Sequence, residues 1–189
     1  DAVKALEGAL AGAPVPLRAA IGEGLLRCAD AAGSDRAARA IHDRLRAADV
    51  PAAVRMAAFR GAILTRGDDG VPMILEALRG TDGLAITTAL RAAHELPGRG
   101  ATKQLAAALG SLPPAIRPSV VTLLGARGDA AAAPALIEVA RAPGDSALRI
   151  GAIGALVMTS AEDSVPVLAG LALDADTNLA ASARAALGS

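Results

Sequence analysis

Apolar residues recur along this chain at intervals of 31 to 33 residues, and no other feature constrains the fold as strongly. Five of them, each inside a helix-like apolar pattern, mark the series: Ile41, Ile74, Leu105, Leu136 and Leu168. A leucine or alanine follows each one four residues later, which places both on one helical face. A unit of this length that returns regularly is typical of stacked helical pairs. The pattern therefore predicts a helical repeat array, in which each pair covers the apolar face of the next.

A second series of positions, read independently, gives nearly the same period. It consists of an apolar residue, followed by arginine in four of six cases, at intervals of 30 to 37 residues: Leu17, Val54, Ile86, Ile116, Leu148 and Leu179. Small or apolar residues follow Leu148 three, four, seven and eight places later, which again lie on one helical face. We call the helix that this series opens helix A, and the helix that carries the first series helix B.

Turn and capping residues fall between these helices. Three B helices have a proline near their start, where a missing N–H costs nothing: Pro72, Pro134 and Pro166. Gly67-Asp68 and Gly128-Asp129 predict the end of helix A followed by an acidic N-cap. Other aspartates stand shortly before helix A: Asp49, Asp145, and Asp174 or Asp176. We expect them to cap helix A and to pair with the arginines that recur at one repeat position: Arg18, Arg55, Arg117 and Arg149.

The two series predict an all-α superhelix of eleven or twelve helices in antiparallel pairs, as a single array over residues 1–189. An unpaired helix B over residues 1–12 precedes five repeats and a terminal half repeat: 14–48, 50–80, 82–111, 113–143, 145–174 and 176–189. Because the sequence begins at Asp1 inside a helical pattern, without a methionine, we expect it to be a fragment of a longer protein.

Composition agrees with this fold and narrows the ligands. Alanine and leucine favour helices, and strand formers are few. The 19 basic and 19 acidic residues balance in both halves of the chain, so no basic surface for nucleic acid is expected. Phe59 is the only aromatic residue, which leaves no platform for stacking bases or sugars. With no uninterrupted apolar run of about 18 residues, the sequence also predicts no membrane span.

The apolar-arginine opening of helix A, the Gly-Asp turn and the Pro-x-Leu or Pro-x-Ile start of helix B resemble HEAT repeats. The short variety of about 31 residues, also called HEAT-like phycobilin-lyase repeats, is the more similar one. The resemblance implies a right-handed superhelix with the B helices on its concave face, and protein–protein binding as the usual role. Residues 12–50 depart from the pattern by their greater length, and the third repeat by Thr87 and by lacking the proline.

The most charged segment is helix B of the first full pair, which carries the candidate partner-binding residues Arg36, Arg39, Arg44 and Arg46. Arg36 and Arg39 lie one helical turn apart and are able to hold an acidic group of a partner together. The alternative is a solvated face with internal ion pairs, each worth about 0–1 kcal/mol.

Two histidines and one cysteine are the remaining candidates for chemistry. His94-Glu95 resembles the dipeptides that bind two irons in HEAT-like hydroxylases, but the other histidine, His42, is at a non-equivalent position. We expect His94 to be a buried or half-buried helix-end residue with a hydrogen-bond partner, and no metal, because two histidines do not supply a typical first shell. Cys28 has no histidine near it in sequence to act as a base. We therefore expect neither catalysis nor a cofactor.

These observations predict a non-catalytic scaffold that presents its B helices to a protein partner or to another domain of its own chain. One alternative is a structural spacer within a larger bacterial multidomain enzyme or cytochrome-type protein, and another is a HEAT-like metal-dependent hydroxylase or lyase. A bacterial origin is suggested by arginine, which supplies 17 of the 19 basic residues. The last helix A (Leu179, Ala183, Leu187) lacks a helix B, so we expect an exposed apolar stripe and weak self-association through the terminal helices. The sequence indicates no compartment.

Overall fold

A computed structural model describes residues 2–33, 36–160 and 162–188. This part of the chain forms twelve α-helices, which are joined by turns and short 3-10 helices. The described residues contain no strand. The prediction of an all-α helical solenoid is therefore confirmed. Contacts divide the chain into two compact units, Asp1–Leu96 and Pro97–Ser189.

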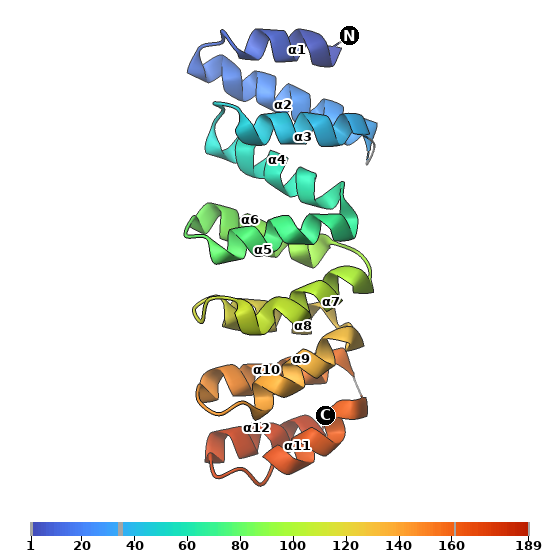
Figure 1. Ribbon diagram of the computed structural model, residues 1–189, viewed down its shortest axis with the longest axis vertical. Coiled ribbons are helices and arrows are strands. Elements are labelled where there is room, and N and C mark those ends of the chain that lie inside the picture. Colours follow the sequence, from blue (N-terminus) through green and yellow to red (C-terminus); the bar gives the residue numbers. More distant parts are fainter. Residues whose placement is uncertain (1, 34–35, 161, 189) are drawn as a thin grey trace. The chain divides into compact units, whose positions relative to one another are not determined.

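The first unit contains six helices stacked in chain order (Figure 1). Their bounds are α1 (Ala2–Leu10), α2 (Val15–Ala32), α3 (Arg36–Ala47), α4 (Ala52–Leu64), α5 (Val71–Arg79) and α6 (Gly83–Glu95), with the 3-10 helix η1 (Gly67–Gly70) before α5. The A helices α2, α4 and α6 pack against one another in sequence, and the B helices α1, α3 and α5 each pack on the helix A that follows them. This is the arrangement expected of stacked pairs.

The second unit repeats this arrangement with six more helices (Figure 1). Their bounds are α7 (Arg99–Ala108), α8 (Arg117–Arg127), α9 (Ala133–Arg141), α10 (Ser146–Thr159), α11 (Val165–Leu171) and α12 (Thr177–Leu187). The 3-10 helices η2 (Leu109–Ser111), η3 (Ala130–Ala132) and η4 (Glu162–Ser164) lie at the ends of the B helices α7, α9 and α11. The expected third repeat, 82–111, spans both units, so the single array over residues 1–189 stays a prediction.

The five residues that revealed the repeat form the core of the B helices. Ile41, Ile74, Leu105, Leu136 and Leu168 are each at most 3% exposed. The core is otherwise rich in alanine, which lets neighbouring A helices approach closely. Gly125 on α8 illustrates this approach, because a Cβ atom added there would lie 2.9 Å from the Cα and Cβ of Ala155 on α10.

Aspartates cap three A helices, as the sequence predicts for two of them. The carboxylate of Asp145 accepts a hydrogen bond from the N–H of Leu148 on α10, and Asp82 and Asp176 cap α6 and α12 in the same way. Asp49 is not a cap, because Pro51 holds the N-cap position of α4. In the same way Arg66 is the N-cap of η1, so the predicted acidic cap at Asp68 is wrong. Asp129, its counterpart, does cap η3.

The recurring arginines of helix A hold the preceding turn. Arg18 and Arg149 form the predicted ion pairs, with Asp49 and Asp174 respectively. Arg55 and Arg117 instead donate to main-chain carbonyls, and for these two the predicted carboxylate pairing is wrong. The acceptors include the carbonyl five residues earlier, at 2.7 Å for Val50 and 2.9 Å for Leu112, and Arg18 makes the same bond to Ala13 at 2.7 Å. These carbonyls follow the end of a helix, where they have no partner within it.

Candidate functional site

Helix α3 presents all four predicted partner-binding arginines to solvent. It buries Ala38, Ile41, His42 and Leu45, so the arginines lie on the remaining faces. Arg44 pairs with Glu7 on α1, and the Nε of Arg39 donates to the carbonyl of Thr65 after α4 at 3.0 Å. Arg36 forms no hydrogen bond or ion pair with the described residues, and Arg46 extends over α4. The four side chains thus serve different neighbours, and the joint hold of Arg36 and Arg39 on an acidic group stays a prediction.

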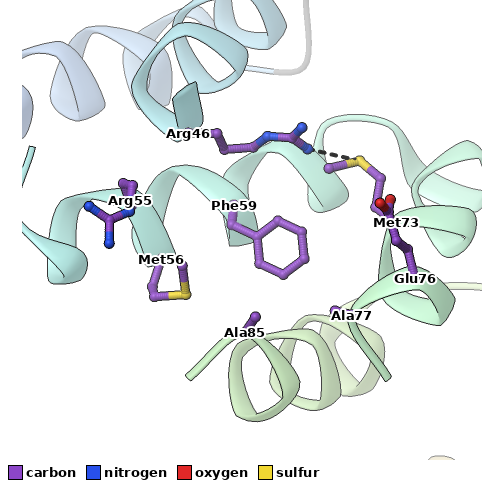
Figure 2. Close-up of a pocket in the computed structure, with 8 residues that line it drawn as sticks. All are labelled: Arg46, Arg55, Met56, Phe59, Met73, Glu76, Ala77 and Ala85. Atoms are coloured by element: carbon purple, nitrogen blue, oxygen red, sulfur yellow. Dashed lines mark hydrogen bonds between the residues drawn. The ribbon is translucent and has the colours of Figure 1, made fainter. Parts of the chain in front are cut away.

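Arg46 lies on the edge of a groove between the B helices α3 and α5, with α4 as its floor and the start of α6 at one side (Figure 2). We call it the Phe59 groove, and its volume is about 280 Å³. Eight residues line it: Arg46, Arg55, Met56, Phe59, Met73, Glu76, Ala77 and Ala85. The groove therefore combines the only aromatic ring of the chain with two of its three methionines.

The charged groups of the Phe59 groove are arranged around this apolar floor. The Cζ of Arg46 lies 5.9 Å from the centroid of the Phe59 ring, within the range of a cation–π contact. One of its nitrogens lies 3.7 Å from the sulfur of Met73. Arg55 donates to the Val50 carbonyl, and Glu76 lies beside Met73 at the other end of the groove (Figure 2). Within the described residues, neither arginine forms an ion pair with a carboxylate.

Sequence reasoning missed this groove. It named Arg46 from its helix and Phe59 from its rarity, but it did not place them together. The available signal was weak: Met56 and Phe59 lie three residues apart and hence on one face of α4, and Arg46 and Met73 occupy the flanking B helices. The convergence of these residues depends on how three helices pack.

Further grooves lie between successive B helices. In the first unit, the groove between α1 and the end of α3 has a volume of about 360 Å³. In the second unit, a groove of about 540 Å³ lies between α7 and α9, and one of about 740 Å³ lies between α9 and the start of α11. The last of these is lined by Ile137 and by three carboxylates, those of Glu138, Glu162 and Asp163. A groove between the A helices α4 and α6 has about 400 Å³.

His42 lies on the buried side of α3 and is only 3% exposed. Its ring packs flat against Gly61 of α4, where a Cβ atom would overlap it. The Nδ1 atom has no hydrogen-bond partner among the described residues. Burial lowers the pKa of His42 below its ordinary value, against the opposing effect of the Asp30 and Asp43 carboxylates, and the Arg66 guanidinium adds to the lowering.

The His94-Glu95 dipeptide ends α6. His94 is exposed, so the prediction of a buried or half-buried residue is wrong. The buried face of α6 is formed by Ala89, Ala92 and Ala93, and His94 lies one position past this face. Glu95 forms an ion pair with Arg60 of α4, and the hydrogen bond from Arg60 lowers the pKa of Glu95. Glu95, next to His94, thus forms a structural contact between the two A helices α4 and α6.

The remaining candidates for chemistry lie apart from one another in the described part of the chain. No group of three or more histidine, cysteine, aspartate or glutamate side chains in it is arranged to hold a metal ion. Cys28 is half-buried and packs against the core formed by α2, α3 and α4. Gly67–Gly70 forms the 3-10 helix η1 between α4 and α5, and Gly98 is the N-cap of α7.

The terminal helix α12 does not expose the predicted apolar stripe. Leu179 and Ala183 are fully buried, because α12 packs against both α10 and α11, and only Leu187 is exposed, at 43%. At the other end, Leu6 and Leu10 of α1 are half-buried against the core of the first unit. Neither helix therefore offers a broad apolar surface for self-association.

Part of the second unit resembles a known family. The family model of HEAT repeats matches residues 102–188, which extend from within α7 to the end of α12. No curated protein matches the chain. No helix in the described ranges combines the length and the apolar character that crossing a membrane requires. The segment over residues 102–188, which contains most of the second unit, is thus similar to HEAT repeats.

Proposed function

We propose that this chain is a non-catalytic scaffold that binds a protein partner, or another domain of its own chain, through the surface of its B helices. HEAT repeats usually mediate protein–protein interaction, and the family is generally non-catalytic. The observation that carries the proposal is the position of the grooves. Four of the grooves described above are lined by B helices or by the segments that adjoin them, whereas one lies between the A helices α4 and α6.

These grooves have the composition of binding surfaces. Each combines small or apolar side chains with a few charged groups, which is typical of sites that fix a ligand by shape and orient it by polar contacts. The Phe59 groove has arginines on its edge, whereas the groove between α9 and α11 has only carboxylates among its charged residues. Different segments of one partner are thus accommodated by different grooves. Arg36, Arg39 and Arg44 extend the basic surface of α3 beside the Phe59 groove.

Ion pairs elsewhere in the chain support a structural role for several of its acidic residues. Arg60 holds Glu95, Arg99 holds Asp129, and Arg149 holds Asp174. A carboxylate that is fixed in this way is stabilised in its ionised form and is poorly suited to general acid–base chemistry near neutral pH. This arrangement favours binding over catalysis.

Site-specific photo-crosslinking tests the proposal. A photoreactive amino acid is placed on B helices, at Arg46 or Glu138, and on the exposed side of A helices, at Ala57 or Ala126, in the full protein. We expect adducts with partner proteins, or with another domain of the same chain, from the B positions only. Equal adducts from the A positions, or none from any position in cells that make the parent protein, would refute a B-helix binding surface.

A further inference from the structure

We propose that the Phe59 groove binds an extended segment of a partner protein that carries an aliphatic side chain next to an acidic residue. The inference rests on the proposed function and adds the chemistry of the partner segment. It follows from three properties of the groove: its size, its apolar floor, and the two arginines without a carboxylate partner at its edge.

The size of the groove indicates what enters it. At about 280 Å³ it lies just below the range of about 300–1,000 Å³ that is usual for small-molecule sites. It is also open to solvent rather than enclosed. These properties fit one side chain of a larger partner, with the adjoining main chain across the opening.

The floor selects an apolar side chain of flexible shape. Phe59, Met56 and Met73 are all half-buried, so each presents part of its surface to the groove. Methionine side chains are unbranched and polarisable, and they adapt to differently shaped apolar groups. An aliphatic side chain would therefore replace water over the Phe59 ring without a need for one fixed geometry.

The edge selects an acidic neighbour. Ion pairs hold Arg18, Arg44, Arg60, Arg66, Arg99 and Arg149, and all six have a carboxylate partner within the described residues. Arg46 and Arg55 are among the arginines outside these ion pairs, and they are the two that line the Phe59 groove; their contacts with the described residues are a ring face, a sulfur and one main-chain carbonyl. A guanidinium group binds a carboxylate through paired N–H donors, and Arg46 is already held at the groove by Phe59. A carboxylate of the partner would complete these two sites.

Glu76 gives the segment a direction. It lines the end of the groove away from Arg55 (Figure 2) and repels a second acidic residue there. The acidic residue is therefore expected between the guanidinium groups of Arg46 and Arg55, on the side of Arg46 that faces away from Glu76 (Figure 2). The groove between α9 and α11 provides the contrast, since Glu138, Glu162 and Asp163 line it without a basic residue. An acidic segment should avoid that groove.

The first experiment selects ligands from a displayed library of random linear peptides on the full chain. We expect enrichment of peptides with an acidic residue next to leucine, isoleucine or methionine. Binding of the enriched peptides should fall at least tenfold for Arg46→Glu and should weaken for Phe59→Leu, which keeps an apolar residue but removes the ring. Arg141→Glu is the matched control, because it makes the same change of charge in the last turn of a different helix B, α9, and is exposed.

The second experiment locates the bound peptide by NMR of the full chain with carbon-13-labelled methionine methyl groups. The three methionines give three signals, and Met56 and Met73 line the groove whereas Met158 lies in the second unit. An enriched acidic peptide should shift the signals of Met56 and Met73 and leave that of Met158 unchanged.

The outcomes separate this inference from the proposed function. If enriched peptides are basic, or bind Arg46→Glu as tightly as the unchanged chain, or leave the signals of Met56 and Met73 in place, the groove assignment is wrong while a binding function stands. If the library yields no binding peptide at all, both the inference and peptide binding by the B-helix surface are contradicted. Circular dichroism of each variant verifies that it is folded.

Discussion

Gly125 lies where the A helices α8 and α10 approach most closely, and Gly125→Ala should destabilise the protein. The added Cβ would lie 2.9 Å from both the Cα and the Cβ of Ala155. These atoms belong to the main chain and its first side-chain carbon, so no rotamer change relieves the overlap and the two helices must separate. Overpacking of this kind costs about 1–3 kcal/mol. Alanine returns about 1 kcal/mol through its higher helix propensity, which leaves a net loss of about 0–2 kcal/mol.

Gly154 on α10 supplies the matched control. It is also inside an A helix of the second unit, but a Cβ added there meets nothing within 4 Å. Gly154→Ala should therefore stabilise the protein by about 0.5–1 kcal/mol. The chain has no tryptophan or tyrosine, so urea unfolding is best followed by far-ultraviolet circular dichroism. If Gly125→Ala proves as stable as Gly154→Ala, the close packing of α8 on α10 is not what requires glycine.

Three further changes test other features. The pKa of His42 is lowered in the folded chain, so its contribution to stability is complete above the ordinary pKa of about 6.5 and is lost as pH falls through the folded value. Urea unfolding, measured over the pH range in which His42 becomes protonated, should show this loss of stability. The His42→Gln variant should not show it. Asp145→Ala removes the N-cap of α10 and should cost about 0.5–2 kcal/mol in thermal unfolding, whereas no such cost from a lost cap is expected for Asp49→Ala. Leu136→Ala opens a cavity in the B-helix core and should cost about 2–5 kcal/mol by urea unfolding; a cost under 1 kcal/mol would contradict full burial.

The sequence predicts the helices and their core because burial imposes a period that survives in the residue types. Ile74 and Leu105 are buried and must therefore be apolar, and the spacing between them reveals the repeat. Prediction fails where a residue depends on its neighbours in space. His94 was expected to be buried by analogy with Leu124 and Leu156, but α6 buries a face of alanines that turns His94 outward.

The terminal helix and the candidate site also have features that depend on contacts in space and not on spacing along the chain. Leu179 is buried because α10 and α11 cover the face of α12 on which it lies. The Phe59 groove needs Arg46, Phe59 and Met73 from three helices, and no spacing along the chain brings them together. The basic character of α3 was visible in the sequence, while the apolar floor beneath Arg46 was not.

The bonds from helix A arginines to carbonyls five residues earlier leave the connecting segments free to diverge. A main-chain oxygen is supplied by every amino acid, so the acceptor position imposes no identity on the residue that fills it. Alanine, valine and leucine already serve at Ala13, Val50 and Leu112 within this one chain. The bond therefore tolerates a change of side chain at the acceptor, and burial alone keeps these three positions apolar.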